Sequence, residues 1–192
     1  MTKELSEMTL EELWEMFPIV LSEHKNFWMD WYQAEEKRIL DFLPIQDLNI
    51  HHIGSTAIHG IWAKPIIDIL LEIPSDQSMD FIKEVLIENG YICMAKEEKR
   101  QSFNRGYTNS GFAEQVFHLH LRYCGDNDEV YFRDYMNDHP DIAKQYEALK
   151  LSLWKKYEHN RDGYTSAKGS FVDKYTKRAK TEYQRNKRRS GV

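Results

Sequence analysis

The chain has 192 residues, which suits one domain, or one domain with an appended helical part. Hydrophobic residues make up 41% of it and aromatic residues 13%, enough for a real core, so a disordered chain is excluded. The formal net charge of −5 argues on its face against a protein that coats nucleic acid. No apolar run approaches the roughly 20 residues that a membrane-spanning helix needs, so no membrane partner is expected.

The N-terminal charges and the cysteines indicate a cytoplasmic protein. The first sixteen residues carry five glutamates against one lysine, whereas a secretory or mitochondrial targeting segment needs the opposite charge. Cys93 and Cys124 lie far apart and form neither a CxxC pair nor a metal knuckle. Two reduced thiols are therefore expected.

The charge is unevenly spread along the chain. Residues 174–189 hold eight lysines and arginines against the single Glu182, a net +7, which leaves −12 for the remaining residues because the whole chain carries −5. This basic end interleaves Tyr175 and Tyr183 with its cations but contains no nucleic-acid-binding motif. We expect a solvated, fraying helix end, with contact to RNA, to an anionic surface or to an acidic protein body as open alternatives.

The periodicity of the apolar residues predicts helices first, then strands around one helix, then helices to the end. Thr9 and Glu12 have the spacing of a capping box, Pro44 and Gly90 stop helices, and Pro140 opens one. The predicted helices cover 10–17, 24–43, 78–89, 128–137 (capped by Asp126), 140–159 and 165–189; the predicted strands cover 48–53, 66–73, 91–94, 101–108 and 115–123; the predicted turns cover 96–100, 109–111 and 160–163.

This order of elements predicts an α/β protein of the α+β kind, with a small mixed sheet flanked by helices and a helical C-terminal part. The strand 66–73 has apolar residues on both of its faces, so we expect it to be buried on both sides. Three parts are expected: an N-terminal helical extension over 1–23, the domain over 24–173, and a basic helix end or tail over 174–192.

A Gly-Ser turn follows the first predicted strand at Gly54 and Ser55. Glycine lets the backbone approach a ligand closely, and the next amides and the serine hydroxyl can donate to phosphate oxygens. An ordinary turn has the same composition, so the pair alone is a weak signal.

Asp68 stands inside the apolar strand 66–73, between Ile67 and Ile69. A carboxylate in such a place must be paired, hydrogen-bonded or bound to a metal, because an isolated buried charge is too costly. Lys64, four residues earlier, could pair with it or reach a phosphate. We take a metal-binding or catalytic carboxylate as the better hypothesis and a structural ion pair as the alternative.

His118 and His120 lie two residues apart on a clearly alternating strand, so both imidazoles share one face. Imidazole is a metal ligand and a general base near neutral pH. If this strand lies beside 66–73, both histidines could converge with Asp68. Two structural histidines on a half-exposed face are the alternative.

Taken together and in this order, these stretches resemble the GrpB family, also called UPF0157. The resemblance is carried by 52–57, 64–69 and 118–120, and is extended by 132–135, 139–140, 146–150 and 164–172. It runs from about Trp28 to Tyr175 and implies that the domain over 24–173 has a nucleotidyltransferase-like fold, related to the polymerase-β superfamily.

The resemblance implies metal-assisted nucleotidyl transfer, in which a Gly-Ser turn holds triphosphate and carboxylates hold divalent cations. Gly54 and Ser55 match that turn, and Asp68 matches one position of the usual Asp-x-Asp pair, but Ile66 and Leu70 occupy its possible partner positions. A third carboxylate position falls where His118 or His120 stands.

One carboxylate with two imidazoles is an unusual donor set for Mg²⁺, and it suits Mn²⁺, Zn²⁺, Ni²⁺ or Fe²⁺ better. Three possibilities follow: transfer with a different metal on Asp68, His118 and His120, nucleotide binding without transfer, or direct binding of phosphate by the histidines. A metal-dependent phosphohydrolase is a weaker fourth.

The expected ligand is a nucleoside triphosphate or a related phosphorylated small molecule, and the acceptor of the nucleotidyl group is not specified. The candidates for neutralising phosphate are Lys64, Arg133 and Lys168, with Arg105 a weaker one. For each of them a solvated or structural ion pair is an equally good interpretation.

Overall fold

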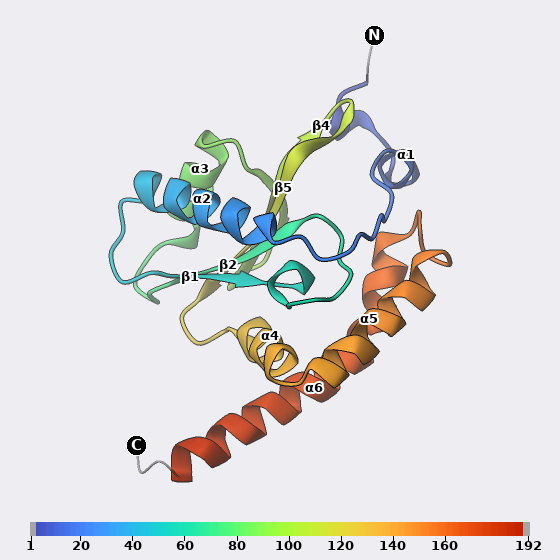
Figure 1. Cartoon of the computed structure of the whole chain (residues 1–192). Helices are drawn as coiled ribbons and strands as arrows, with labels where there is room; N and C mark the ends of the chain where they lie inside the picture. Colours follow the sequence, from blue (N-terminus) through green and yellow to red (C-terminus); the bar gives the residue numbers. More distant parts are fainter. Residues whose placement is uncertain (1–2, 190–192) are drawn as a thin grey trace.

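The computed structural model describes residues 3–189 and centres on a five-stranded mixed sheet (Figure 1). The strands are β1 (Asn49–Ile53), β2 (Ile67–Ile73), β3 (Ile92–Lys96), β4 (Arg100–Thr108) and β5 (Gly111–Tyr123), in the spatial order β1-β2-β5-β4-β3. β2 and β5 run parallel, and every other neighbouring pair is antiparallel. The small mixed sheet and the α+β class are confirmed.

One face of the sheet is covered by α2 (Phe27–Phe42) and α3 (Met79–Glu88). Alternate residues of β2 and β5 point into this layer because successive strand side chains face opposite sides. They pack with Trp28 and Ile39 of α2 and with Ile82 and Leu86 of α3 in the main apolar core. β2 is buried on both faces along most of its length, as its continuous apolar run predicts.

The remaining helices are α1 (Leu10–Met16), α4 (Asp128–Asp138), α5 (Pro140–Trp154) and α6 (Arg161–Arg189). α1 follows a short 3-10 helix (Leu5–Glu7) and carries the predicted capping box of Thr9 and Glu12. α4, α5 and α6 pack on one another beside the second face of the sheet (Figure 1). Their core joins Phe132, Met136 and Tyr146 to Ile58 and Ile61 of the loop after β1.

Most element bounds agree with the predictions within two residues, and α2, α5, α6 and β5 are the exceptions. α5 ends at Trp154 rather than 159, where the following loop pairs instead with the N-terminal segment through Ile19. α6 starts at Arg161 rather than 165: the Asn160 side chain caps its first turn by accepting from the Gly163 amide at 2.7 Å, so this glycine lies inside the helix.

The other two differences lie at strand and helix starts. β5 begins at Gly111 rather than 115 because a tight turn at 109–110 lets Thr108 pair with Gly111. α2 begins at Phe27, three residues later than predicted. The predicted cap by Asp126 is wrong: Asn127 holds the cap position of α4, and Asp126 instead accepts two hydrogen bonds from Arg100, at 2.6 and 2.7 Å.

The basic end of the chain continues α6 without a break, so it is not separated from the domain by a linker. Tyr175, Thr176 and Ala179 are buried against the other helices, and Lys180 forms an ion pair with Asp128 of α4. Residues 181–188 are exposed. Of the predicted extension and tail, residues 1–2 and 190–192 lie outside the described part. Within that part, no helix is both long and apolar enough to cross a bilayer.

Candidate functional site

A cleft of about 870 Å³ lies between the second face of β2 and β5 and the helices α4 to α6. Seven of the predicted residues line it, and their neighbours add further cations. In all, seven lysines and arginines face four carboxylates, so the lining has an excess of positive charge. The predicted residues in the cleft are Gly54, Ser55, Lys64, Asp68, His118, His120 and Lys168.

Asp68 and the two histidines meet at the sheet face because β2 and β5 are parallel neighbours, with Asp68 opposite His118. The Asp68 Oδ1 atom lies 3.3 Å from His118 Nδ1 and 3.9 Å from His120 Nε2. Burial on its own would raise the pKa of Asp68, but the adjacent imidazoles of His118 and His120 outweigh it and hold this pKa below the usual range. Asp68 is therefore an ionised carboxylate at neutral pH.

Gly54 brings the backbone against that carboxylate. Its φ of +71° and ψ of −170° belong to a region that is essentially restricted to glycine. A Cβ atom placed on it would lie 2.2 Å from Asp68 Oδ2. The short 3-10 helix Ser55–Ala57 follows directly. The Gly-Ser turn thus holds the backbone close to Asp68, and its contact with a phosphate ligand stays a prediction.

A metal bound by Asp68, His118 and His120 would need donor atoms that are free and that point at one position. Both ring nitrogens of His118 already face protein partners, since Nδ1 faces Asp68 and Nε2 lies 2.9 Å from the Tyr107 hydroxyl. Over residues 3–189, no three His, Cys, Asp or Glu side chains are placed so that they could hold a metal ion. As arranged, these side chains do not fit a three-ligand centre, and Mg²⁺, Mn²⁺ or Zn²⁺ there stays a prediction.

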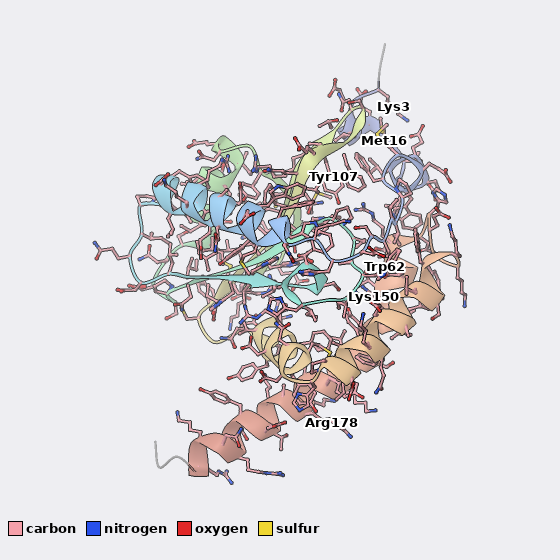
Figure 2. All side chains as sticks on the ribbon, viewed as in Figure 1. Lys3, Met16, Trp62, Tyr107, Lys150 and Arg178 are labelled. Carbon is pink, nitrogen blue, oxygen red and sulfur yellow. The ribbon has the colours of Figure 1, made fainter. Side chains whose placement is uncertain are left out.

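Three lysines face the cleft without a counter-ion. Among the described residues, none of Lys64, Lys150 and Lys168 has a carboxylate within ion-pair distance, although Lys150 is almost fully buried. Burial lowers the pKa of Lys64 and Lys168 to about 8 and that of Lys150 to about 7. Lys150 donates to the Trp62 carbonyl oxygen, and Figure 2 labels both residues.

Two tyrosines complete the helical wall of the cleft. A hydrogen bond with Ser55 lowers the pKa of Tyr146, but burial has the larger effect and raises it to about 12. The ammonium groups of Lys168 and Lys64 lie 4.3 and 5.9 Å from the centroid of the Tyr164 ring. Tyr164 is 1% exposed, and its hydroxyl has no hydrogen-bond partner within residues 3–189.

Two predicted phosphate contacts lie elsewhere. Arg133 is not part of the cleft lining: its guanidinium donates to the His52 carbonyl oxygen at 2.7 Å and pairs with Asp134. Arg105 points to the opposite face of the sheet, where it forms an ion pair with the buried Glu35 of α2. Local partners already neutralise both arginines.

Sequence reasoning missed Tyr107, Lys150, Arg161 and Tyr164 as parts of the site. Tyr164 falls in a stretch that carries the family resemblance, but it has the spacing of an ordinary core residue. Lys150 has four carbons of apolar stem on a helix whose buried face includes Tyr146, so its burial is not visible in the spacing. Tyr107 is brought into the site by an irregularity in the pairing of β4 with β5, which the local sequence pattern does not predict.

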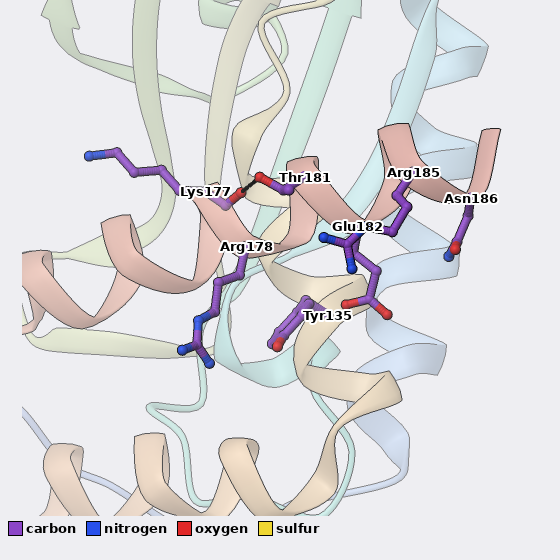
Figure 3. A pocket seen from close by; sticks show the side chains of 7 residues that line it. All are labelled: Tyr135, Lys177, Arg178, Thr181, Glu182, Arg185 and Asn186. Atoms are coloured by element: carbon purple, nitrogen blue, oxygen red, sulfur yellow. Dashed lines mark hydrogen bonds between the residues drawn. The ribbon is translucent and has the colours of Figure 1, made fainter. Parts of the chain in front are cut away.

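A second, smaller hollow of about 540 Å³ lies between α4 and the basic end of α6 (Figure 3). Tyr135 of α4 lines it together with Lys177, Arg178, Glu182 and Arg185 of α6, and Figure 3 shows the Lys177 side chain pointing away from Tyr135. Lys177 also lines the large cleft, so the two hollows adjoin along α6. The basic end is thus continuous with the cationic wall of the cleft.

Comparison with known sequences gives consistent matches. A family model described as GrpB protein matches residues 18–178. The Glutamate-rich protein GrpB of Alkalihalophilus pseudofirmus is 35% identical over 161 residues, which cover 81% of this chain and 92% of that protein. The UPF0157 protein YqkA of Bacillus subtilis is 30% identical over 80% of this chain, but the match spans only 45% of YqkA.

Comparison with solved structures agrees with these matches. The crystal structure of conserved protein GrpB from Enterococcus faecalis superposes with a TM-score of 0.74 at 25% identity, covering 86% of this chain and 99% of that one. A weaker likeness, with a TM-score of 0.48 and 12% identity, is to the nucleotidyltransferase Cid1 poly(U) polymerase, over 74% of this chain and 44% of that one. A likeness of that size says nothing about activity.

Proposed function

The chain belongs to the GrpB family, and we propose that its cleft binds a nucleoside triphosphate or a related phosphorylated small molecule. One observation carries the proposal: Lys64, Lys150 and Lys168 face the same cleft without a carboxylate partner among the described residues. Unpaired buried cations are costly, and a polyanionic ligand would supply the missing counter-charge.

The rest of the lining suits the same ligand. The Gly54–Ser55 turn offers a backbone that a ligand can approach and a hydroxyl, while the lining residues Phe132 and Val172 provide apolar surface for a base or another organic group. Asp68 would face a bound phosphate unfavourably by itself, but it is outnumbered by the lysines around it.

The direct test is a calorimetric titration of the purified chain with ATP, GTP, CTP, UTP and inorganic triphosphate, each with and without Mg²⁺, Mn²⁺ or Zn²⁺. We expect at least one triphosphate to bind, and we expect adenosine, which lacks phosphate, to bind far more weakly. If no phosphorylated compound binds under any of these conditions, the proposal is wrong.

Binding should depend on pH in a defined direction. Because the pKa values of Lys64 and Lys168 are about 8 and that of Lys150 about 7, these amines lose charge as the pH rises from about 7 to 9. Affinity for triphosphate should fall over this range, with proton uptake on binding that shows as a buffer-dependent heat. Stability of the free chain should instead rise with pH, because the unfolded chain, with lysine pKa values near 10.5, binds more protons. An affinity that does not change with pH would contradict the assignment of these lysines.

Nucleotidyl transfer is a second candidate, favoured by the ionised Asp68 carboxylate beside the Gly-Ser turn. In this reaction the acceptor hydroxyl oxygen would bond to the α-phosphorus, the bond from that phosphorus to pyrophosphate would break, and Asp68 would take the hydroxyl proton. The assay follows pyrophosphate release and label transfer from each triphosphate, with Mg²⁺, Mn²⁺ or Zn²⁺, and compares the chain with Asp68→Asn. Release that is lost in Asp68→Asn supports transfer to an acceptor still to be identified; binding without release supports a non-catalytic module.

A further inference from the structure

The pairing of β4 with β5 is irregular between Arg105 and Tyr107. In a regular strand these two residues would share a face, because side chains alternate. Gly106 breaks the alternation with a φ of +92°, so close to β5 that a Cβ atom on it would lie 2.3 Å from the Gln115 carbonyl oxygen. Arg105 therefore contacts Glu35 on one face of the sheet, and Tyr107 contacts His118 on the other.

Tyr107 links His118 to the first residue of α6. Arg161 donates from Nη1 to the Tyr107 hydroxyl oxygen at 2.6 Å. The Tyr107 hydroxyl lies 2.9 Å from His118 Nε2, and His118 Nδ1 lies 3.3 Å from Asp68. Because the Tyr107 oxygen accepts from Arg161, its own hydrogen can point at His118 Nε2, and the other ring nitrogen, Nδ1, is left to donate toward Asp68. The four side chains form one directed chain of donors and acceptors.

Arg161 is otherwise fixed but keeps one donor unused. Its Nε donates to the Phe17 carbonyl oxygen at 3.2 Å, and its guanidinium stacks near the rings of Tyr107 and Phe112. Its Nη2 is buried and has no partner within the described residues, and the same holds for the Tyr164 hydroxyl one helical turn along. Both residues line the cleft. A guanidinium nitrogen can only donate hydrogen bonds, so a ligand that pairs with Arg161 Nη2 must carry an acceptor atom.

We propose that Arg161 and Tyr164 bind a phosphate group of the ligand, and that Arg161, through Tyr107, is also the positioning residue for the His118–Asp68 pair. The proposal rests on the proposed function, because the same ligand would occupy both. Lys64 and Lys168, whose ammonium groups lie near the Tyr164 ring, supply further positive charge. The phosphate-binding end of the cleft is thus connected to its carboxylate through Tyr107 and His118.

The experiment measures two quantities in the full chain. Calorimetry with ATP and inorganic triphosphate gives affinity for Arg161→Gln, Tyr164→Phe and Tyr107→Phe. ¹⁵N NMR of the imidazole rings gives the tautomer of His118, assigned with His118→Gln. Arg185→Gln, which removes the same charge from the exposed far end of α6, is the matched control.

We expect Arg161→Gln to weaken triphosphate binding about tenfold or more, and Tyr164→Phe severalfold, since each loses a hydrogen bond to a charged group. Tyr107→Phe should leave affinity within about twofold but release the fixed tautomer of His118. Arg185→Gln should change neither quantity by more than about twofold. Circular dichroism melts verify that each variant folds. If Arg161→Gln is unstable, Tyr164→Phe still tests the phosphate contact, because it keeps the buried ring and loses only the hydroxyl.

The possible failures are separable. If the unmodified chain binds triphosphate and both Arg161→Gln and Tyr164→Phe bind it equally well, this inference is overturned and the proposed function stands. An unchanged His118 spectrum in Tyr107→Phe overturns it as well, whatever the affinities. If the unmodified chain binds no phosphorylated compound, the proposed function fails, and this inference fails with it.

Discussion

Gly54→Ala should lower the free energy of unfolding by about 3–5 kcal/mol, measured by urea denaturation. Two costs combine. The backbone at Gly54 has φ +71° and ψ −170°, a region where any other residue is strained by roughly 1–3 kcal/mol. The added methyl group would also lie 2.2 Å from the Asp68 carboxylate, which must then leave its place beside His118.

Gly60→Ala is the matched control, because Gly60 has nearly the same φ, +70°, but no atom within 4 Å of the added Cβ. It should cost only the backbone strain, about 1–2 kcal/mol. The difference between the two variants measures the close approach to Asp68, and Gly54→Ala should also shift the His118 imidazole signals. If Gly54→Ala and Gly60→Ala lower the free energy of unfolding equally, the close approach of Gly54 to Asp68 does not contribute to the cost.

The double variant Lys64→Gln with Lys168→Gln should lose about a hundredfold or more in triphosphate affinity, because two charge-assisted hydrogen bonds are removed. The same variant should be slightly more stable than the unmodified chain when no ligand is present. Both lysines are partly buried and lack carboxylate partners in the described part of the chain, so removing their charge relieves a desolvation cost. Opposite signs for affinity and stability are typical of residues kept for binding.

The control for this pair is Lys187→Gln with Arg188→Gln, which removes two charges from the exposed end of α6. At 0.15 M salt the Debye length is about 8 Å, so removing these distant charges should change the triphosphate affinity less than threefold. Calorimetry at two salt concentrations and thermal melts measure both variants. If the two pairs weaken binding equally, general attraction rather than a built site explains the affinity.

The sequence patterns were sufficient to predict the part of the site that lies on the sheet. Asp68 inside an apolar run, with two histidines at a spacing of two on an alternating strand, predicts convergence if the strands are neighbours, and β2 and β5 are. The family resemblance was carried by the same stretches. These residues are predictable because strand geometry has a fixed period and one charged residue in an apolar strand is conspicuous.

The helical side of the site was harder to predict. Arg133 has the right charge at a plausible position, but it is held by the His52 carbonyl and by Asp134, and no spacing reveals such local partners. Gly163 suggests a turn, yet it sits in the first turn of α6, where the Asn160 side chain satisfies its amide and Tyr157 leaves no room for a Cβ atom. Because a turn was predicted at 160–163, Arg161 was not recognised as the first residue of the helix.

The continuity of α6 has a consequence for how an anion meets this protein. One helix carries positive charge from the cleft wall at Lys168 and Lys177 to the exposed end at Lys187, while the residues outside 174–189 carry a net charge of −12. Such a separation gives the molecule a large electric dipole despite its modest net charge. An approaching anion is repelled by one side and drawn to the other, so the direction of encounter, and with it the association rate, is set by the helix rather than by the sum of the charges.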